Sequence, residues 1–197
     1  MKSIAILIGS CVLLTGAGTT QTPPAPSLQP TALEALARQS ATHVVWSSEV
    51  GRLDSRESHA IVTVLVLENS AQPHDRVGGI RIDLSNPDSK DAVYLGEEML
   101  VVYKNSLDEV GRNVPGHRKT ARDDLAPGGT SYLGSGIFWY ADARPHVHAL
   151  SASYYFAPDS EGLYLRACND AGFRFPDLEP SQLSATIARA IVQLSNH

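Results

Sequence analysis

Cysteine is scarce in this sequence, which has two cysteines, Cys11 and Cys168, among 197 residues. Cys11 falls inside an expected signal segment, so removal of that segment would leave Cys168 as a lone thiol. A chain with one thiol has no internal disulfide, and its stability must come from packing. No Cys–His signature surrounds Cys168, so we interpret it as a small buried apolar residue and not as a nucleophile.

Basic residues are also in the minority, with 16 lysines and arginines against 21 aspartates and glutamates, for a formal net charge of −5. Binding to a phosphate backbone needs a basic excess, so we expect no nucleic acid partner. An apolar content of 43% and a charged content of 19% are ordinary for a globular protein. We therefore expect a globular chain and not one that is disordered throughout.

Long hydrophobic runs are absent as well. The run from Ile4 to Leu14 follows a single positive charge, Lys2, and is too short to span a bilayer. We interpret residues 1–18 as a signal peptide and the proline-rich residues 19–30 as an extended tether. The protein is then exported, to the periplasm or beyond, with no transmembrane segment. The apolar run continues past Cys11, which disfavours a lipid anchor at that position.

Several motifs of catalysis and cofactor binding are missing. The sequence has no glycine-rich phosphate loop, no dinucleotide-binding fingerprint and no paired-carboxylate motif, so we expect no cofactor. Ser135 in Leu133-Gly134-Ser135-Gly136 misses the nucleophile elbow by one residue and precedes a strand. We lean against an enzyme, although catalytic groups from distant strands leave that possibility open.

What the sequence does contain is a repeat. The stretch from Gly79 to Val110 has a weaker copy from Gly162 to Leu194. Each begins with an alternating strand, followed by a polar turn and a short second strand, 93–95 or 173–175. Each ends in a helix with an apolar stripe at the same i, i+4, i+8, i+11 spacing. The stripes are Met99, Tyr103, Leu107 and Val110, and Leu183, Ile187, Ile191 and Leu194.

The correspondence extends upstream, because Trp46 and His59 have counterparts in Trp139 and His148. We predict an α+β protein of two pseudo-repeated units, each of about four antiparallel strands followed by a helix, with a short N-terminal helix. Residues 31–111 would form that helix and the first half, and residues 133–197 the second half. Gly111 suits a left-handed helix end, so residues 112–132 are predicted to be a linker.

Two groups of side chains in the sequence have the chemistry of metal ligands. His146 and His148 occupy alternate strand positions and could supply two zinc ligands, but no further ligand motif completes the set. The acidic turn could bind calcium, yet its spacing misses the calcium-loop pattern and turn chemistry already explains it. We expect no bound metal. The residues of that turn are Asp83, Asn86, Asp88 and Asp91.

Surface side chains are the remaining candidates for function. A basic cluster in the predicted linker could meet a partner, or it could be a solvated loop. Tyr154 and Tyr155 are consecutive on a strand, so one of them would be exposed if one sheet face were uncovered. If both faces were covered, both tyrosines would be structural. The basic candidates are His117, Arg118, Lys119 and Arg122.

Export, duplication and the lack of a reactive constellation together favour a non-enzymatic binding protein. At the level of fold, duplicated antiparallel sheets backed by helices resemble exported inhibitor proteins that grip an enzyme with a concave sheet. We expect a protein that occludes a protein partner in the envelope, as an inhibitor or toxin-immunity protein does. The alternatives are a small-ligand carrier with an apolar cavity and a hydrolase whose site is assembled from distant strands.

Overall fold

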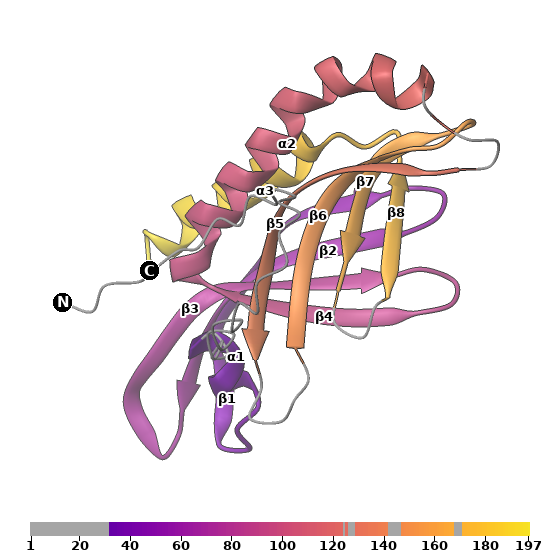
Figure 1. Cartoon of the computed structure of the whole chain (residues 1–197). Helices are drawn as coiled ribbons and strands as arrows, with labels where there is room; N and C mark the ends of the chain where they lie inside the picture. The colour runs from indigo at the N-terminus through magenta and orange to yellow at the C-terminus, as the bar shows by residue number, and fades with distance from the viewer. Residues whose placement is uncertain (1–31, 124, 126–128, 142–146, 168–170) are drawn as a thin grey trace, which may run out of the picture.

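The structure, a computed structural model, describes residues 32–123, 125, 129–141, 147–167 and 171–197 (Figure 1). It contains two antiparallel four-stranded sheets, each followed by a long helix, and a short N-terminal helix, so the predicted α+β class is confirmed. The elements are α1 (Ala32–Ala37), β1 (Thr42–Asp54), β2 (His59–Asn69), β3 (Gln72–Ser85), β4 (Lys90–Gly96), α2 (Glu97–Asp123), β5 (Ser131–Ala141), β6 (Val147–Phe156), β7 (Glu161–Arg166), β8 (Gly172–Pro176) and α3 (Pro180–Leu194).

Both sheets are meanders in which each strand pairs with the next strand along the chain. The orders are β1-β2-β3-β4 and β5-β6-β7-β8. Tight turns make this possible: Asn86 Oδ1 accepts hydrogen bonds from the backbone N–H groups of Asp88 and Ser89, and the Ala157 N–H donates to the Ser160 carbonyl at 2.8 Å. These are the polar turns that the sequence predicts, and side-chain to backbone bonding is the reason such residues favour turns.

One hydrophobic core joins the two sheets. In Figure 1 the second sheet lies in front of the first and their strands cross. Alternate residues of the central strands face each other across this layer, as period-2 patterning requires. Complete burial of each large side chain contributes about 1.5–3 kcal/mol. The cluster includes Val62, Val64, Ile80, Ile82, Leu84, Leu150, Leu163, Leu165, Phe173 and Phe175.

The two long helices pack across the halves. α2 and α3 contact each other, and α2, which ends the first half, also contacts β5 and β6 of the second sheet. α3, which ends the second half, contacts β1, β2 and β3 of the first sheet. The Arg189 Nε–H donates to the Val50 carbonyl at 3.2 Å and ties α3 to the edge of β1. Each half therefore completes the core of the other.

The short helix α1 covers part of the outer face of the first sheet. Leu33 and Leu36 are buried against Leu65 and Leu67 of β2. These two β2 residues point away from the main core, because side chains on a strand alternate between faces. No described helix covers the outer face of the second sheet in the same way (Figure 1).

The first long helix continues well past its predicted end. We expected a left-handed cap at Gly111 and a linker from residue 112, whereas α2 runs on to Asp123 with Pro115 inside it. The physical reason is that Val114, one helical turn after Val110, is buried against aromatic side chains of β6. Burial of Val114 and the contacts of Arg118 with Glu161 and Glu179 oppose the cost of about 1 kcal/mol for Gly111 and about 3 kcal/mol for Pro115 inside a helix. Figure 1 shows α2 changing direction toward its C-terminal end, as an internal proline causes.

Residues 69–79 close the hairpin between β2 and β3. They belong largely to β3, and β2 pairs with β3 up to the contact between Asn69 and Gln72. The Asn69 side-chain oxygen accepts a hydrogen bond from the Ala71 N–H at 2.9 Å and closes a tight turn. Within the part of the chain that the structure describes, no helix is both long and apolar enough to cross a membrane.

Candidate functional site

A hollow of about 430 Å³ opens on the outer face of the second sheet, at its junction with two turns of the first sheet. The β1–β2 turn and the β3–β4 turn form one wall, and strands β5, β7 and β8 form the floor. Most of the lining side chains are polar or aromatic. The lining residues are Arg56, Glu57, Ser58, Asn86, Pro87, Asp88, Tyr132, Tyr164, Gly172 and Arg174.

The hollow exists because the two turns reach the free edge of β8. The side-chain amide of Asn86 donates to the Gly172 carbonyl at 3.2 Å, and the Ser55 hydroxyl donates to the Arg174 carbonyl at 3.4 Å. Gly172 and Arg174 alternate along the strand, so both carbonyls point away from β7. Unpaired edge carbonyls need partners, and here the turns of the other sheet supply them.

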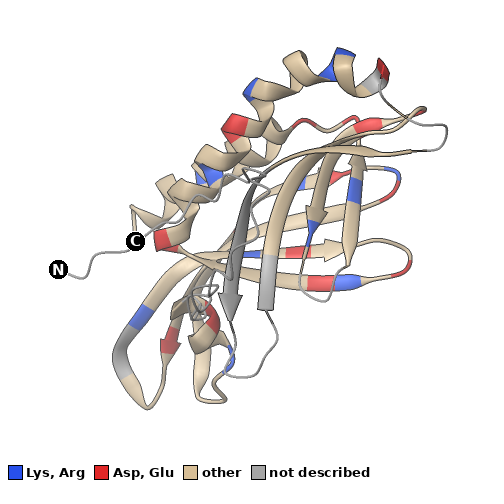
Figure 2. Cartoon of the chain, viewed as in Figure 1, with Lys and Arg blue, Asp and Glu red and all other residues tan. Residues whose placement is uncertain are grey.

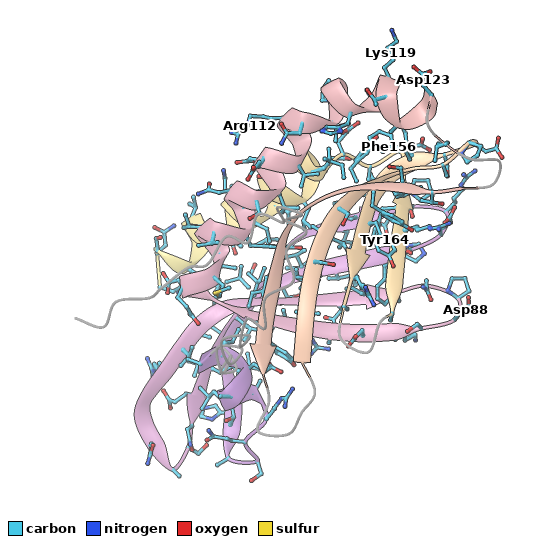
Figure 3. The ribbon with its side chains drawn as sticks, in the orientation of Figure 1. Asp88, Arg112, Lys119, Asp123, Phe156 and Tyr164 are labelled. Carbon is cyan, nitrogen blue, oxygen red and sulfur yellow. The ribbon has the colours of Figure 1, made fainter. Side chains whose placement is uncertain are left out.

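Two tyrosines stand together on the floor of the hollow. The rings of Tyr132 on β5 and Tyr164 on β7 have their centroids 5.2 Å apart at an interplanar angle of 53°. Tyr132 is 47% exposed. A Cβ at position 172 would lie 2.2 Å from the Tyr164 hydroxyl oxygen, so Gly172 leaves the room that this ring occupies. Figure 3 shows Tyr164 on the strand floor and Asp88 at the tip of a neighbouring turn.

Arg174 lies beside these rings and is held in place by aromatic residues. Its guanidinium carbon is 5.5 Å from the centroid of the Tyr155 ring, which is cation–π geometry. A hydrogen bond with the Tyr132 hydroxyl holds the pKa of Arg174 above its ordinary value. Among the described residues, no carboxylate forms an ion pair with Arg174. The Glu57 carboxylate, also in the lining, attracts Arg174 electrostatically and raises its pKa further. The hollow therefore presents a cation that aromatic contacts fix and that no ion pair engages.

The other charged side chains of the hollow lie on the two turns of the first sheet, near residues of the same turn. Arg56 Nε lies 3.7 Å from Glu57 Oε1 on the β1–β2 turn, and both side chains are well exposed. Asp88 occupies the exposed tip of the β3–β4 turn, where its N–H donates to Asn86. Figure 2 shows charges of both signs at these turns. A lining with donors, acceptors and aromatic faces suits a polar or amphipathic partner surface.

Neither of the two tyrosines predicted as partner contacts is exposed. Tyr154 is 2% exposed and Tyr155 is 0% exposed. Tyr155 does lie on the outer face, opposite Tyr132, but Arg174 covers its ring. Tyr154 faces the other way and packs with Phe156 under α2. Both tyrosines are therefore buried, which is the alternative expected for covered faces, because side chains from other elements cover both positions.

The basic candidates on α2 divide into two kinds. His117 and Lys119 are exposed, and the side chain of Arg122 lies outside the described residues. Arg118 instead points inward: its Nε lies 2.7 Å from Glu161 Oε1 and its Nη2 lies 3.2 Å from Glu179 Oε1.

Arg118 also bonds to a buried tyrosine. Its Nη2 donates to the Tyr154 hydroxyl at 3.4 Å, and that hydrogen bond holds the pKa of Arg118 above its ordinary value. Burial raises the pKa of Tyr154 to about 12. Arg118 thus joins α2, β6, β7 and the start of α3, which is a structural role.

The metal candidates are not brought together by the described part of the chain. His146 lies outside the described residues, as does Cys168, and the side chains of His148 and Ser135 are likewise not described. In the acidic turn, Asp83 pairs with Arg81, while Asp91 accepts a hydrogen bond from the Ala92 N–H at 2.8 Å. Among the described residues, no three His, Cys, Asp or Glu side chains converge to hold a metal ion.

Sequence reasoning missed Tyr132, Tyr164 and Arg174. Tyr164 and Arg174 face each other across the β7–β8 pair, and both alternate with the buried residues of their strands. That alternation was a usable signal, because it places a tyrosine and an arginine on the face opposite the core. Comparisons with known proteins add nothing to this site: no family model, no curated protein and no solved structure matches the chain.

Proposed function

We propose that this protein is an exported binding protein that occludes a protein partner with the outer face of its second sheet. The expected signal peptide, residues 1–18, supports export. The observation that carries the proposal is the cluster of exposed Tyr132 and Arg174 with half-buried Tyr164, on a sheet face that no described helix covers. Tyrosine and arginine are the side chains most enriched at the energetic centres of protein interfaces.

Pre-organisation adds to this support. Tyr164 fits over Gly172, and Arg174 is fixed on the Tyr155 ring, so these side chains lose little freedom when a partner covers them. Ordering a flexible side chain at an interface costs about 0.5–1.5 kcal/mol, and rigid side chains avoid that cost. A rigid aromatic floor with one fixed cation is therefore suited to binding a protein surface.

Affinity capture with matched variants tests the proposal. The mature protein is immobilised and exposed to envelope extract of its source organism, in parallel with a Tyr132→Ser/Tyr164→Ser double variant and a Val101→Ser control. Val101 is 54% exposed on α2, away from the hollow. We expect a protein that the wild type and the control capture and the double variant loses. Capture that all three share, or no capture, contradicts the proposal.

The two alternative functions gain less from the structure. A carrier of apolar ligands needs an apolar cavity, whereas the lining of the hollow is mainly polar. Of the lining residues, Glu57 and Asp88 are the usual acids and bases of hydrolases, but they lie on two different turns, Glu57 beside Arg56 and Asp88 at an exposed tip. We therefore propose binding rather than catalysis as the role of this site.

A further inference from the structure

The arrangement of charged side chains in the hollow indicates which chemical group of the partner binds there. Two arginines and two carboxylates line the hollow, but they are not equivalent. Arg56 lies next to Glu57, and Asp88 extends into solvent at the tip of a turn. Arg174 has aromatic neighbours on the floor; Glu57 attracts it electrostatically, but among the described residues no carboxylate forms an ion pair with it.

The surroundings of Arg174 leave its guanidinium fork available. One face of the guanidinium lies over the Tyr155 ring, and the Tyr132 hydroxyl bonds to it. A guanidinium has five N–H donors in a fixed plane, and these two contacts use only part of that capacity. A planar fork held against an aromatic ring matches the two oxygens of a carboxylate in a bidentate contact.

We propose that Arg174 binds a carboxylate of the partner protein, supplied either by an acidic side chain or by the C-terminus. This inference rests on the proposed function and specifies the chemistry of the partner at the same site. Tyr132 and Tyr164 flank the carboxylate and contact the apolar part of the segment that carries it. Arg174 is thus the specificity-determining cation, and the two tyrosines supply contact area.

Four short peptides test the inference without knowledge of the partner. They are Ac-Gly-Glu-Gly-NH2, its glutamine analogue, Ac-Gly-Gly-Gly with a free carboxylate, and the same peptide as an amide. Binding is followed by the NMR shifts of the backbone amide resonances of Tyr132, Tyr164 and Gly172, which are present in every variant, during titration of the full mature chain. We expect at least one carboxylate peptide to bind at least tenfold more tightly than its neutral analogue. The pair that shows this difference identifies the source of the carboxylate.

Substitutions of Arg174 distinguish a bidentate contact with its guanidinium from a general effect of positive charge. Arg174→Gln should abolish the difference between charged and neutral peptides, and Arg174→Lys should restore only part of it, because an ammonium lacks the bidentate geometry. Arg52→Gln is the control, since Arg52 is an exposed arginine on β1 that pairs with Glu49. In these variants the backbone amide spectrum of the folded state reports that the fold is retained.

The outcomes are distinguishable from failure of the proposed function. Equal binding of charged and neutral peptides, no binding of any peptide, or carboxylate binding that survives Arg174→Gln overturns the inference. None of these results affects capture of a partner through Tyr132 and Tyr164. If a captured partner binds Arg174→Gln as tightly as wild type, the inference is wrong while the proposed function stands.

Discussion

The side-chain amide of Asn86, on a turn of the first sheet, donates a hydrogen bond to the backbone carbonyl of Gly172, on the edge strand of the second sheet, at 3.2 Å. The same side chain closes its own turn through Oδ1, which accepts two backbone N–H groups. One residue therefore shapes the turn and fastens that turn to the other sheet. The hollow lies at this junction.

Asn86→Asp separates these two roles. The aspartate keeps an oxygen for the turn but loses the N–H that reaches Gly172, and it brings a negative charge near a carbonyl. We expect a loss of about 1 kcal/mol in the free energy of unfolding, measured by urea denaturation, which is typical of one hydrogen bond. Asn86→Ala removes both roles and should cost more. Equal stabilities for wild type and Asn86→Asp would contradict the bridge between the sheets.

Arg118 should act in stability and not in partner binding. Arg118→Gln removes its contacts with Glu161, Glu179 and Tyr154. Because the guanidinium is partly exposed, we expect a modest loss of about 1–2 kcal/mol in the free energy of unfolding. Lys119→Gln, one residue along on the exposed side of α2, should change stability by less than about 0.5 kcal/mol. If the two variants are equally stable, Arg118 does not join these elements.

Gly111→Ala tests the continuation of α2. In an uninterrupted helix, alanine is more favourable than glycine by about 0.8–1 kcal/mol, and a Cβ at position 111 would come no closer than 3.9 Å to Pro180. We therefore expect Gly111→Ala to stabilise the protein, as measured by the midpoint of thermal unfolding. A left-handed cap at this position would instead make alanine destabilising, so the sign of the change decides between the two structures.

High pH should weaken the fold through Tyr154. Its pKa is raised to about 12 by burial, whereas an unfolded tyrosine titrates near about 10. The unfolded chain therefore loses this proton first, and the stabilisation is complete below pH ~10 and declines as pH rises from there toward ~12. Urea denaturation at pH values from about 9 to about 11.5 should show that the free energy of unfolding falls more steeply with pH for wild type than for Tyr154→Phe. If the free energy of unfolding falls equally with pH in the two proteins, Tyr154 does not cause the loss of stability at high pH.

The sequence predicts those features of the fold that depend on local periodicity. The stripe from Tyr103 to Val110 and the alternation in β7 are complete within one element, and the structure confirms them. The end of α2 depends on contacts with β6, some 40 residues further on, so a local rule at Gly111 was wrong. The polar turn at Asn86 was predicted as a turn, but its bond to Gly172 could not be, because that bond requires the second sheet.

The candidate site was predicted less well than the fold. Tyr154 and Tyr155 were chosen because they are adjacent in sequence, yet exposure depends on what covers each face. Arg174 covers one of them and α2 the other. The residues of the site come from β5, β7 and β8 and from two turns of the other sheet. Their proximity arises from strand pairing and from the crossing of the two sheets, which single-sequence patterns do not encode.

Site-specific photo-crosslinking tests the central claim most directly. A photoreactive phenylalanine analogue at position 132 or 164 lies on the proposed binding face, whereas positions 101 and 192 lie on the exposed sides of α2 and α3. After irradiation in the cell envelope, we predict a covalent adduct with a protein from positions 132 and 164 and none from 101 and 192. Adducts only from the helix positions, or no adduct from the sheet positions, would contradict the account.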